Sequence, residues 1–272
     1  MSNEKLSSAL QGLAGIEDEL ENCDKKVQNY RLSLLQPVYT KRNALIQDVP
    51  DFWKIVLTQH QDFADYIQVE DFRYVENISS IAIDWKSIDE FQITFKFQGI
   101  DDDFPEQTVC KKFKLEYDID KIYNPNKLKP EELEDMEEFG YWTSEPCGIQ
   151  WPVSYNGFNP AKIMDKSSAN GKKNYRKGMK SFFGWFKWTG LKIGKEFPNG
   201  QDLATLFTDD IYPHCLKYYT QAHRDLEDER DGTDSEEDDE EEPAFGIPEE
   251  DESEEEDEEE GPASKKVKKS NL

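Results

Sequence analysis

Residues 6–35, LSSALQGLAGIEDELENCDKKVQNYRLSLL, return to an apolar side chain every seven positions. One apolar row consists of Leu6, Leu13, Leu20, Val27 and Leu34, and the row beside it of Leu10, Ile16, Cys23 and Tyr30. Polar and charged residues fill the other positions, which is typical of a long helix with one apolar stripe. Because the stripe runs through four heptads and occurs once in the chain, it predicts a coiled coil between two copies. We therefore expect residues 1–47 to form a dimerisation helix, although such a stripe can also pack on the helix's own domain.

Prolines are expected to shape this helix and the one after it. Pro37 should kink or interrupt the long helix, because proline lacks a backbone donor and crowds the preceding turn. Asp48, Pro50 and Asp51 are helix-start residues, and the apolar run that follows from Phe52 predicts a second, mostly buried helix.

From Ile78 onward the apolar period changes from helical spacing to two. The alternating residues fall into three groups: Ile81, Ile83 and Trp85; Phe91, Ile93, Phe95 and Phe97; Val109, Phe113, Leu115 and Tyr117. The links between them are short, polar and rich in turn residues, which favours hairpins and an antiparallel meander. Residues 120–140 are acidic and contain proline, and they predict an exposed insertion in which residues 131–139 favour a short helix. Apolar spacing over residues 202–228 predicts a final helix with a kink at Pro213.

These patterns define the predicted fold class and its parts. The fold class is α+β, in which a long N-terminal dimerisation helix precedes an antiparallel β-sheet that packs against helices. We expect one α+β domain over residues 48–226. After Leu226 the chain has too little apolar content to fold, so residues 227–272 are expected to be a disordered acidic tail.

The charge of the chain is concentrated in that tail. The formal net charge is -26, and residues 225–260 contain 24 of the 59 acidic residues. Such runs repel themselves, stay extended and attract basic partners, although an acidic tail can also serve only solubility. This charge argues against nucleic acid as the main ligand, so nucleic acid is expected to bind weakly or indirectly at most. Lys265, Lys266, Lys268 and Lys269 resemble a nuclear import signal read by importin, or an incidental lysine-rich end.

A second basic segment lies inside the domain. Its cations are Lys172, Lys173, Arg176, Lys177 and Lys180, and they precede a cluster of aromatic residues at positions 182–188. Positive charge beside aromatic rings can bind nucleic acid. We expect instead that Phe182, Phe183, Trp185 and Phe186 are core, because a domain of this size needs large buried side chains, and that the cations line a solvated edge.

The sequence offers little for catalysis. It contains no phosphate-binding loop, no HExxH and no GxSxG motif, and its only histidines are His60, His214 and His223. The four cysteines are far apart in the chain, which argues against a zinc site or a disulfide framework. We also find no cleavable signal pattern and no apolar run of membrane-spanning length. A non-enzymatic intracellular protein without a cofactor, and not in a membrane, is therefore expected.

Four motifs, in this order along the chain, resemble the nucleosome assembly protein (NAP/SET) family. They are FWKIVL at 52–57 with QH at 59–60, TSEP at 143–146 followed by IQWP at 149–152, SFFGWF at 181–186, and DDIYP at 209–213. The resemblance implies a headphone-shaped homodimer that binds core histones, assists nucleosome assembly in the nucleus and masks histone charge. Since the likeness is strongest to a fungal SET-type member that accompanies a histone acetyltransferase, it also implies such an enzyme as a partner.

The resemblance also implies where histones bind. It places Asp209, Asp210 and the companion Glu196 on an acidic concave face. The tail would add further acids, represented by Glu236, Glu237, Asp238, Asp239, Glu254, Glu255 and Glu256. Two alternatives remain open: a SET-like scaffold or phosphatase inhibitor without histone deposition, and an enzyme with an unrecognised carboxylate pair.

Overall fold

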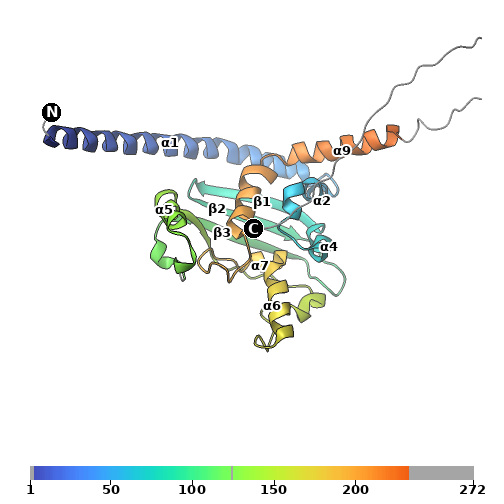
Figure 1. Cartoon of the computed structure of the whole chain (residues 1–272). Helices are drawn as coiled ribbons and strands as arrows, with labels where there is room; N and C mark the ends of the chain where they lie inside the picture. The colour runs from blue at the N-terminus through green and yellow to red at the C-terminus, as the bar shows by residue number, and fades with distance from the viewer. Residues whose placement is uncertain (1–2, 124, 233–272) are drawn as a thin grey trace, which may run out of the picture. The chain divides into compact units, whose positions relative to one another are not determined.

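The computed structural model describes residues 3–123 and 125–232 (Figure 1). It begins with one long helix, α1, from Asn3 to Ile46. At 1.5 Å per residue this helix is about 66 Å long. The interruption considered at Pro37 does not occur, since α1 continues through this residue. A proline inside a helix removes a single backbone hydrogen bond, and the flanking Gln36 and Tyr39 contact the sheet and hold both sides of the proline in place.

The N-terminal part of α1 has no neighbour within the described chain. Residues 5–24 are all exposed. In the first apolar row, Leu6, Leu13, Leu20, Val27 and Leu34 are 54–65% exposed. The stripe therefore does not pack on its own domain, which removes the alternative considered from the sequence.

The C-terminal part of α1 is fixed to the edge of the sheet. The Asn29 side chain accepts a hydrogen bond from the Ile88 amide at 3.0 Å. Gln36 accepts one from the Trp85 amide at 3.4 Å and donates one to the Ile83 carbonyl at 3.2 Å. These amide side chains satisfy backbone groups that an edge strand leaves open. They also fix the direction in which α1 leaves the domain.

The sheet is the predicted antiparallel meander, with a fourth strand that the sequence pattern did not reveal. Its strands run in the order β1-β2-β3-β4. They are β1 (Ile78–Ser87), β2 (Glu90–Phe97), β3 (Gln107–Glu116) and β4 (Tyr141–Ser144). The register pairs Ile83 with Ile93 and Phe91 with Phe113. The residues with period two thus line one buried face.

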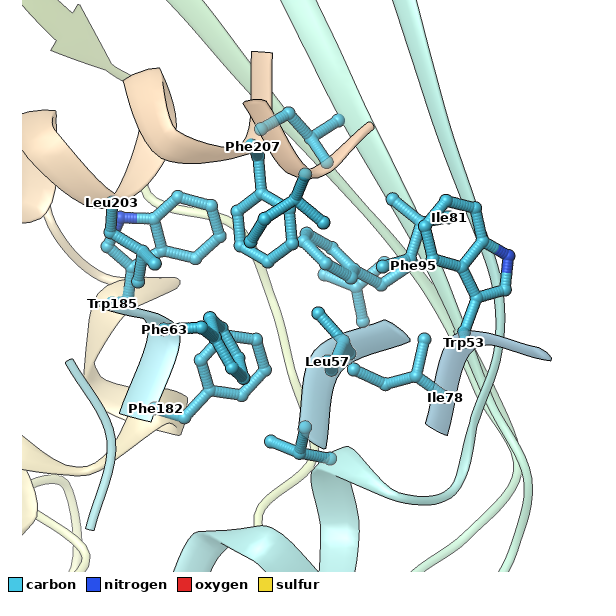
Figure 2. Close-up of a cluster of buried hydrophobic side chains, with 14 of the residues drawn as sticks. Trp53, Leu57, Phe63, Ile78, Ile81, Phe95, Phe182, Trp185, Leu203 and Phe207 are labelled. Carbon is cyan, nitrogen blue, oxygen red and sulfur yellow. The ribbon is translucent and has the colours of Figure 1, made fainter. Parts of the chain in front are cut away.

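Short helices cover that buried face. They are α2 (Phe52–Gln59), α3 (Gln61–Ala64), α4 (Phe72–Val75), α7 (Phe182–Trp185) and α8 (Gly200–Thr205). Figure 2 shows Phe95 of β2 among Phe182, Trp185 and Phe207. The ring centroid of Phe95 lies 6.0, 6.0 and 5.2 Å from theirs. These four side chains are fully buried, and so are Phe183 and Phe186, so the prediction that the 182–186 aromatics are core is confirmed.

The predicted final helix is in fact three segments. These are α8, the π-helix η5 (Leu206–Ile211) and α9 (Cys215–Gly232). The prediction of one kinked helix over 202–228 was therefore wrong in detail. In η5 the Tyr212 amide bonds the Phe207 carbonyl, five residues back, at 3.1 Å. Pro213, which has no amide, lies between η5 and α9. α9 also extends past residue 226, where the domain was expected to end.

The remaining elements connect these layers. They are η1 (Val69–Asp71), η2 (Ile119–Lys121), η3 (Pro125–Lys127), α5 (Pro130–Phe139), η4 (Val153–Gly157) and α6 (Ala169–Lys180). α5 is the short helix predicted within the acidic insertion. α2 starts where the sequence indicated, but Asp51 makes no side-chain cap and has a left-handed backbone with φ of 54°.

Candidate functional site

Carboxylates from three elements gather around two tyrosines. Burial raises the pKa of Tyr66, and the negative charges of Asp202, Asp62 and Asp65 raise it further. Asp62 also raises the pKa of Tyr218, after burial and the contact with Asp210. Residues from α3, α8 and η5 therefore share one surface, although up to 148 positions separate them in the chain. We call this surface the acidic face and define it by Asp62, Asp65, Asp202, Asp209 and Asp210.

Asp210 is the most strongly held carboxylate of the acidic face. It accepts hydrogen bonds from the Tyr218 hydroxyl at 2.8 Å, from His60 Nε2 at 3.0 Å and from His214 Nδ1 at 3.0 Å. Burial opposes its ionisation, but the bonds from Tyr218, His60 and His214 outweigh burial and lower its pKa. The carboxylate is therefore charged at neutral pH, and its side chain remains 36% exposed.

His60 is a structural residue of this surface. It is buried at the N-cap of α3, where Nδ1 accepts a hydrogen bond from the Phe63 amide at 3.3 Å. An acceptor Nδ1 places the proton on Nε2, which then donates to Asp210. His60 thus ties α3 to η5, and this tie brings Asp62 and Asp65 beside the carboxylates of η5.

The π-helix determines which way its own acids point. Leu203, Phe207 and Ile211 are fully buried and anchor α8 and η5 to the sheet. Asp209 is on the outer side and exposed, and it accepts a hydrogen bond from the Thr208 hydroxyl at 2.9 Å. Because a π-turn inserts an extra residue, it re-aims the side chains of a helix and is common at functional sites.

The Glu196 carboxylate bonds to its own loop and is not part of the acidic face. Its carboxylate accepts hydrogen bonds from the Thr189 amide at 3.1 Å and the Gly190 amide at 2.9 Å, and from the Thr189 hydroxyl. Both oxygens are therefore used to hold the loop that contains Gly190, whose φ is 78°. The structure does not bring Glu196 into the hydrogen-bonded cluster around Asp210.

Sequence reasoning missed Asp62, Asp65 and Asp202. Asp62 and Asp65 are three positions apart, which places two residues on one side of a helix and was a usable signal. Their approach to Asp202 depends on how α3 packs in the core, where the ring centroid of Phe63 lies 5.7 Å from that of Phe207, and no local pattern reveals this packing. The tail acids Glu236 to Asp239 and Glu254 to Glu256, and the lysines at 265–269, lie outside the described residues.

Other kinds of site find no support among the described residues. No three His, Cys, Asp or Glu side chains in residues 3–123 and 125–232 are placed to hold a metal ion. None of the helices in that part of the chain is long and apolar enough to cross a membrane. All four cysteines lie within it, and each is a free thiol.

Known proteins are similar to this chain in both sequence and fold. The sequence matches no protein-family model. It is 47% identical over 230 residues to the vacuolar protein sorting-associated protein 75 of Saccharomyces cerevisiae, covering 82% of this chain and 81% of that one. It is 29% identical to a putative nucleosome assembly protein of Schizosaccharomyces pombe, over 97% of this chain and 99% of the other.

A solved structure gives the same result for the fold. The crystal structure of the Vps75 histone chaperone superposes with a TM-score of 0.69 at 46% identity, covering 80% of this chain and 99% of that one. Its likeness extends to the long helix, the four-stranded antiparallel sheet and the helices that cover it. The chain therefore belongs to the nucleosome assembly protein (NAP/SET) family of histone chaperones.

Proposed function

We propose that this chain binds core histones through the acidic face and the acidic tail, and that it does so as a homodimer without catalysing a reaction. The observation that supports this proposal most is that Asp62, Asp65, Asp202 and Asp210 gather around Tyr66 and Tyr218, with Asp209 exposed next to Asp210. Three side-chain donors hold Asp210 in place, while the adjacent Asp209 is exposed to a ligand.

The mechanism is charge masking by a fixed surface. Histone surfaces that bind DNA are rich in Lys and Arg, so carboxylates on a chaperone compete with DNA phosphates for the same cations. Charges are screened beyond about 8 Å at physiological salt, so attraction acts only when the surfaces meet. A rigid array of carboxylates suits this need, since His60 and Tyr218 hold Asp210 in place before histones arrive.

The exposed seam of α1 supports the homodimer. Nine large apolar residues of α1 from Leu6 to Val38 are more than half exposed. Continuous apolar surface of this kind marks an interface, and a repeat of seven suits a helical partner of the same sequence. The residues proposed to pair are those of the first row: Leu6, Leu13, Leu20, Val27 and Leu34.

The tail and its basic end complete the proposal. Acids such as Glu236 and Glu254 would extend the acidic face and speed the capture of basic partners. Lys265, Lys266, Lys268 and Lys269 would bind importin and place the protein in the nucleus, where it assists nucleosome assembly. Partnership with a histone acetyltransferase rests on the likeness to the SET-type relatives.

The test removes charge from the acidic face without disturbing the fold. We expect Asp62→Asn, Asp202→Asn and Asp209→Asn together to weaken the binding of histone H3–H4 about tenfold, because each exposed ion pair contributes roughly 0.5 kcal/mol. The measurement is fluorescence titration of labelled histones with the full chain, at low and at physiological salt.

A matched control removes the same number of charges elsewhere. Asp102→Asn, Glu134→Gln and Glu145→Gln change three exposed acids outside the acidic face. The control variant should bind histones within about twofold of the unaltered chain. Equal losses in the two variants would mean that net charge alone, and not the acidic face, recruits histones. A phosphatase inhibitor or scaffold would bind its enzyme but would not relieve the precipitation of histones on DNA.

A further inference from the structure

A cleft of about 1040 Å³ lies between α5, α6 and the loop at 188–202. We call it the α5–α6 cleft. The apolar residues Trp142, Trp188 and Phe197 line it, and we call them its floor; Met136 and Met179, which have flexible side chains, also line it. The volume is at the upper end of the range of about 300–1,000 Å³ for small-molecule sites, and methionines adapt to varied apolar ligands. The cleft can therefore accept several side chains at once.

The ionisable residues of the α5–α6 cleft leave it positive. Its acids are Glu132, Glu196 and Asp202, and its cations are Arg176, Lys177, Lys180, Lys192 and Lys195. Glu132 already accepts a hydrogen bond from the Lys129 amide at 2.7 Å, and Glu196 is used by the loop of Thr189.

Most of the cations in the cleft form no ion pair with another described residue. Lys177 pairs with Glu70 at 2.6 Å. Within residues 3–123 and 125–232, Arg176, Lys180 and Lys192 form no ion pair. In a chain of net charge -26, three such cations around an apolar floor form a site for an anion with an apolar part.

The packing of α6 makes its basic side a fixed surface. Its five cations, at positions 172, 173, 176, 177 and 180, fall on one side of a helix with 3.6 residues per turn. Gly178 is buried on another side, where an added Cβ would lie 2.0 Å from the Phe158 carbonyl oxygen. Because an added Cβ would clash here, α6 is held with its basic side outward, and three of its cations, Arg176, Lys177 and Lys180, line the cleft.

We propose that the α5–α6 cleft binds a short acidic peptide of a partner protein. Carboxylates of the peptide pair with Arg176, Lys180 and Lys192, while an aromatic or long aliphatic side chain enters the floor beside Trp142 and Trp188. Acidic motifs are read in this way by clusters of basic side chains. Asp202 is the one defining residue of the acidic face that also lines the cleft. The cations that would hold the peptide are not part of the acidic face, so the proposal does not depend on histone binding.

The surroundings of the cleft favour a peptide over nucleic acid. α5 forms one wall and exposes the acids Glu131, Glu134, Asp135, Glu137 and Glu138. A long polyanion that left the cleft would meet these carboxylates and be repelled. A short peptide can place its acids on α6 without passing over α5. A hydrophobic side chain would also bury apolar surface against the floor, whereas a phosphate backbone would not.

The test uses fluorescence anisotropy with the full chain and a fluorescein-labelled peptide of sequence EDEFDED. We expect saturable binding that weakens at least tenfold when Arg176→Gln, Lys180→Gln and Lys192→Gln are combined. The matched control variant, with Lys41→Gln, Lys112→Gln and Lys114→Gln, removes three exposed cations elsewhere and should bind within about twofold. A peptide with Ser in place of Phe should bind about tenfold more weakly, because the apolar floor is then left empty.

Three results would overturn the proposal. The first is that no saturable binding of the peptide occurs, and the second is that both triple variants bind it equally well. The third is that a single-stranded oligonucleotide of the same charge binds more tightly than the peptide and displaces it, which would assign the cleft to nucleic acid. Histone binding measured on the same variants should stay unchanged, so failure here is distinct from failure of the acidic face.

Discussion

Lys111 offers a direct test of the packing of the sheet, because it is a charged residue in the fully buried face of β3. Its Nζ donates to the Trp188 carbonyl at 2.8 Å and lies 5.4–5.8 Å from the ring centroids of Phe113, Trp185 and Trp188. Burial lowers the pKa of Lys111 to about 8, with only a small opposing effect from Cys147 and Glu196. The unfolded chain keeps an ordinary lysine pKa of about 10.4.

The consequence is a stability that rises with pH. Between the two pKa values the folded chain has lost this proton and the unfolded chain has not, so raising the pH favours folding. For these values Lys111 adds about 1.3 kcal/mol to the free energy of unfolding between pH 7 and pH 9. Lys111→Met keeps the length of the side chain and removes the titration. From pH 7 to pH 9, the unaltered chain should therefore gain about 1.3 kcal/mol of unfolding free energy relative to the variant.

The assay is urea unfolding at pH 7 and pH 9, followed by tryptophan fluorescence at one fixed protein concentration. Lys112→Met is the matched control, because Lys112 is the next residue on β3 and is exposed. The control should show the same difference from the unaltered chain at both pH values. If Lys111→Met also shows no change with pH, Lys111 titrates as a solvated lysine and the described burial is wrong.

Three further predictions concern other parts of the molecule. Asp71 is buried and accepts from the Phe182 amide, the Ser181 and Tyr155 hydroxyls and the Gln68 amide, so Asp71→Leu should lower the unfolding free energy by about 2–4 kcal/mol. Asp71→Asn, which keeps an acceptor for the two amides, should cost less than half as much in the same urea assay. Gly178→Ala should cost about 1–3 kcal/mol through its clash with Phe158, whereas Gly157→Ala, where an added Cβ meets nothing within 4 Å, should cost less than about 0.5. Charged residues in place of Leu13, Leu20 and Val27 should halve the sedimentation mass, and an unchanged mass would refute the seam.

Much of the fold was readable from local patterns. The alternation of Phe91, Ile93, Phe95 and Phe97 predicted a half-buried strand, and the heptads predicted α1, because each pattern reports on a single element. β4 has only four residues and no alternation, so its place beside β3 depends on how the insertion before it folds back. The π-helix was missed because a change from bonds four residues back to bonds five residues back, such as that from the Tyr212 amide to the Phe207 carbonyl, leaves no clear mark on apolar spacing.

The candidate site was readable only in part. The motif that contains Asp209 and Asp210 directed attention to η5, but the partners of Asp210 could not be predicted. His60 is 150 positions away and reaches Asp210 only because the sheet and its helices bring α3 beside η5. Glu196 was expected on the binding face, but its carboxylate accepts hydrogen bonds from amides of its own loop. Sequence alone could not predict this local use.

The central claim is that a folded surface of this chain, and not only its polyanionic tail, binds histones. The most direct measurement is the binding of histone H3–H4 to the full chain and to a chain that ends at Gly232, across a salt series, with sedimentation mass recorded on the same samples. We predict a dimer in both cases, and a shorter chain that binds more weakly but still saturably at physiological salt. Complete loss of binding without the tail would contradict the account, because the acidic face would then contribute nothing by itself.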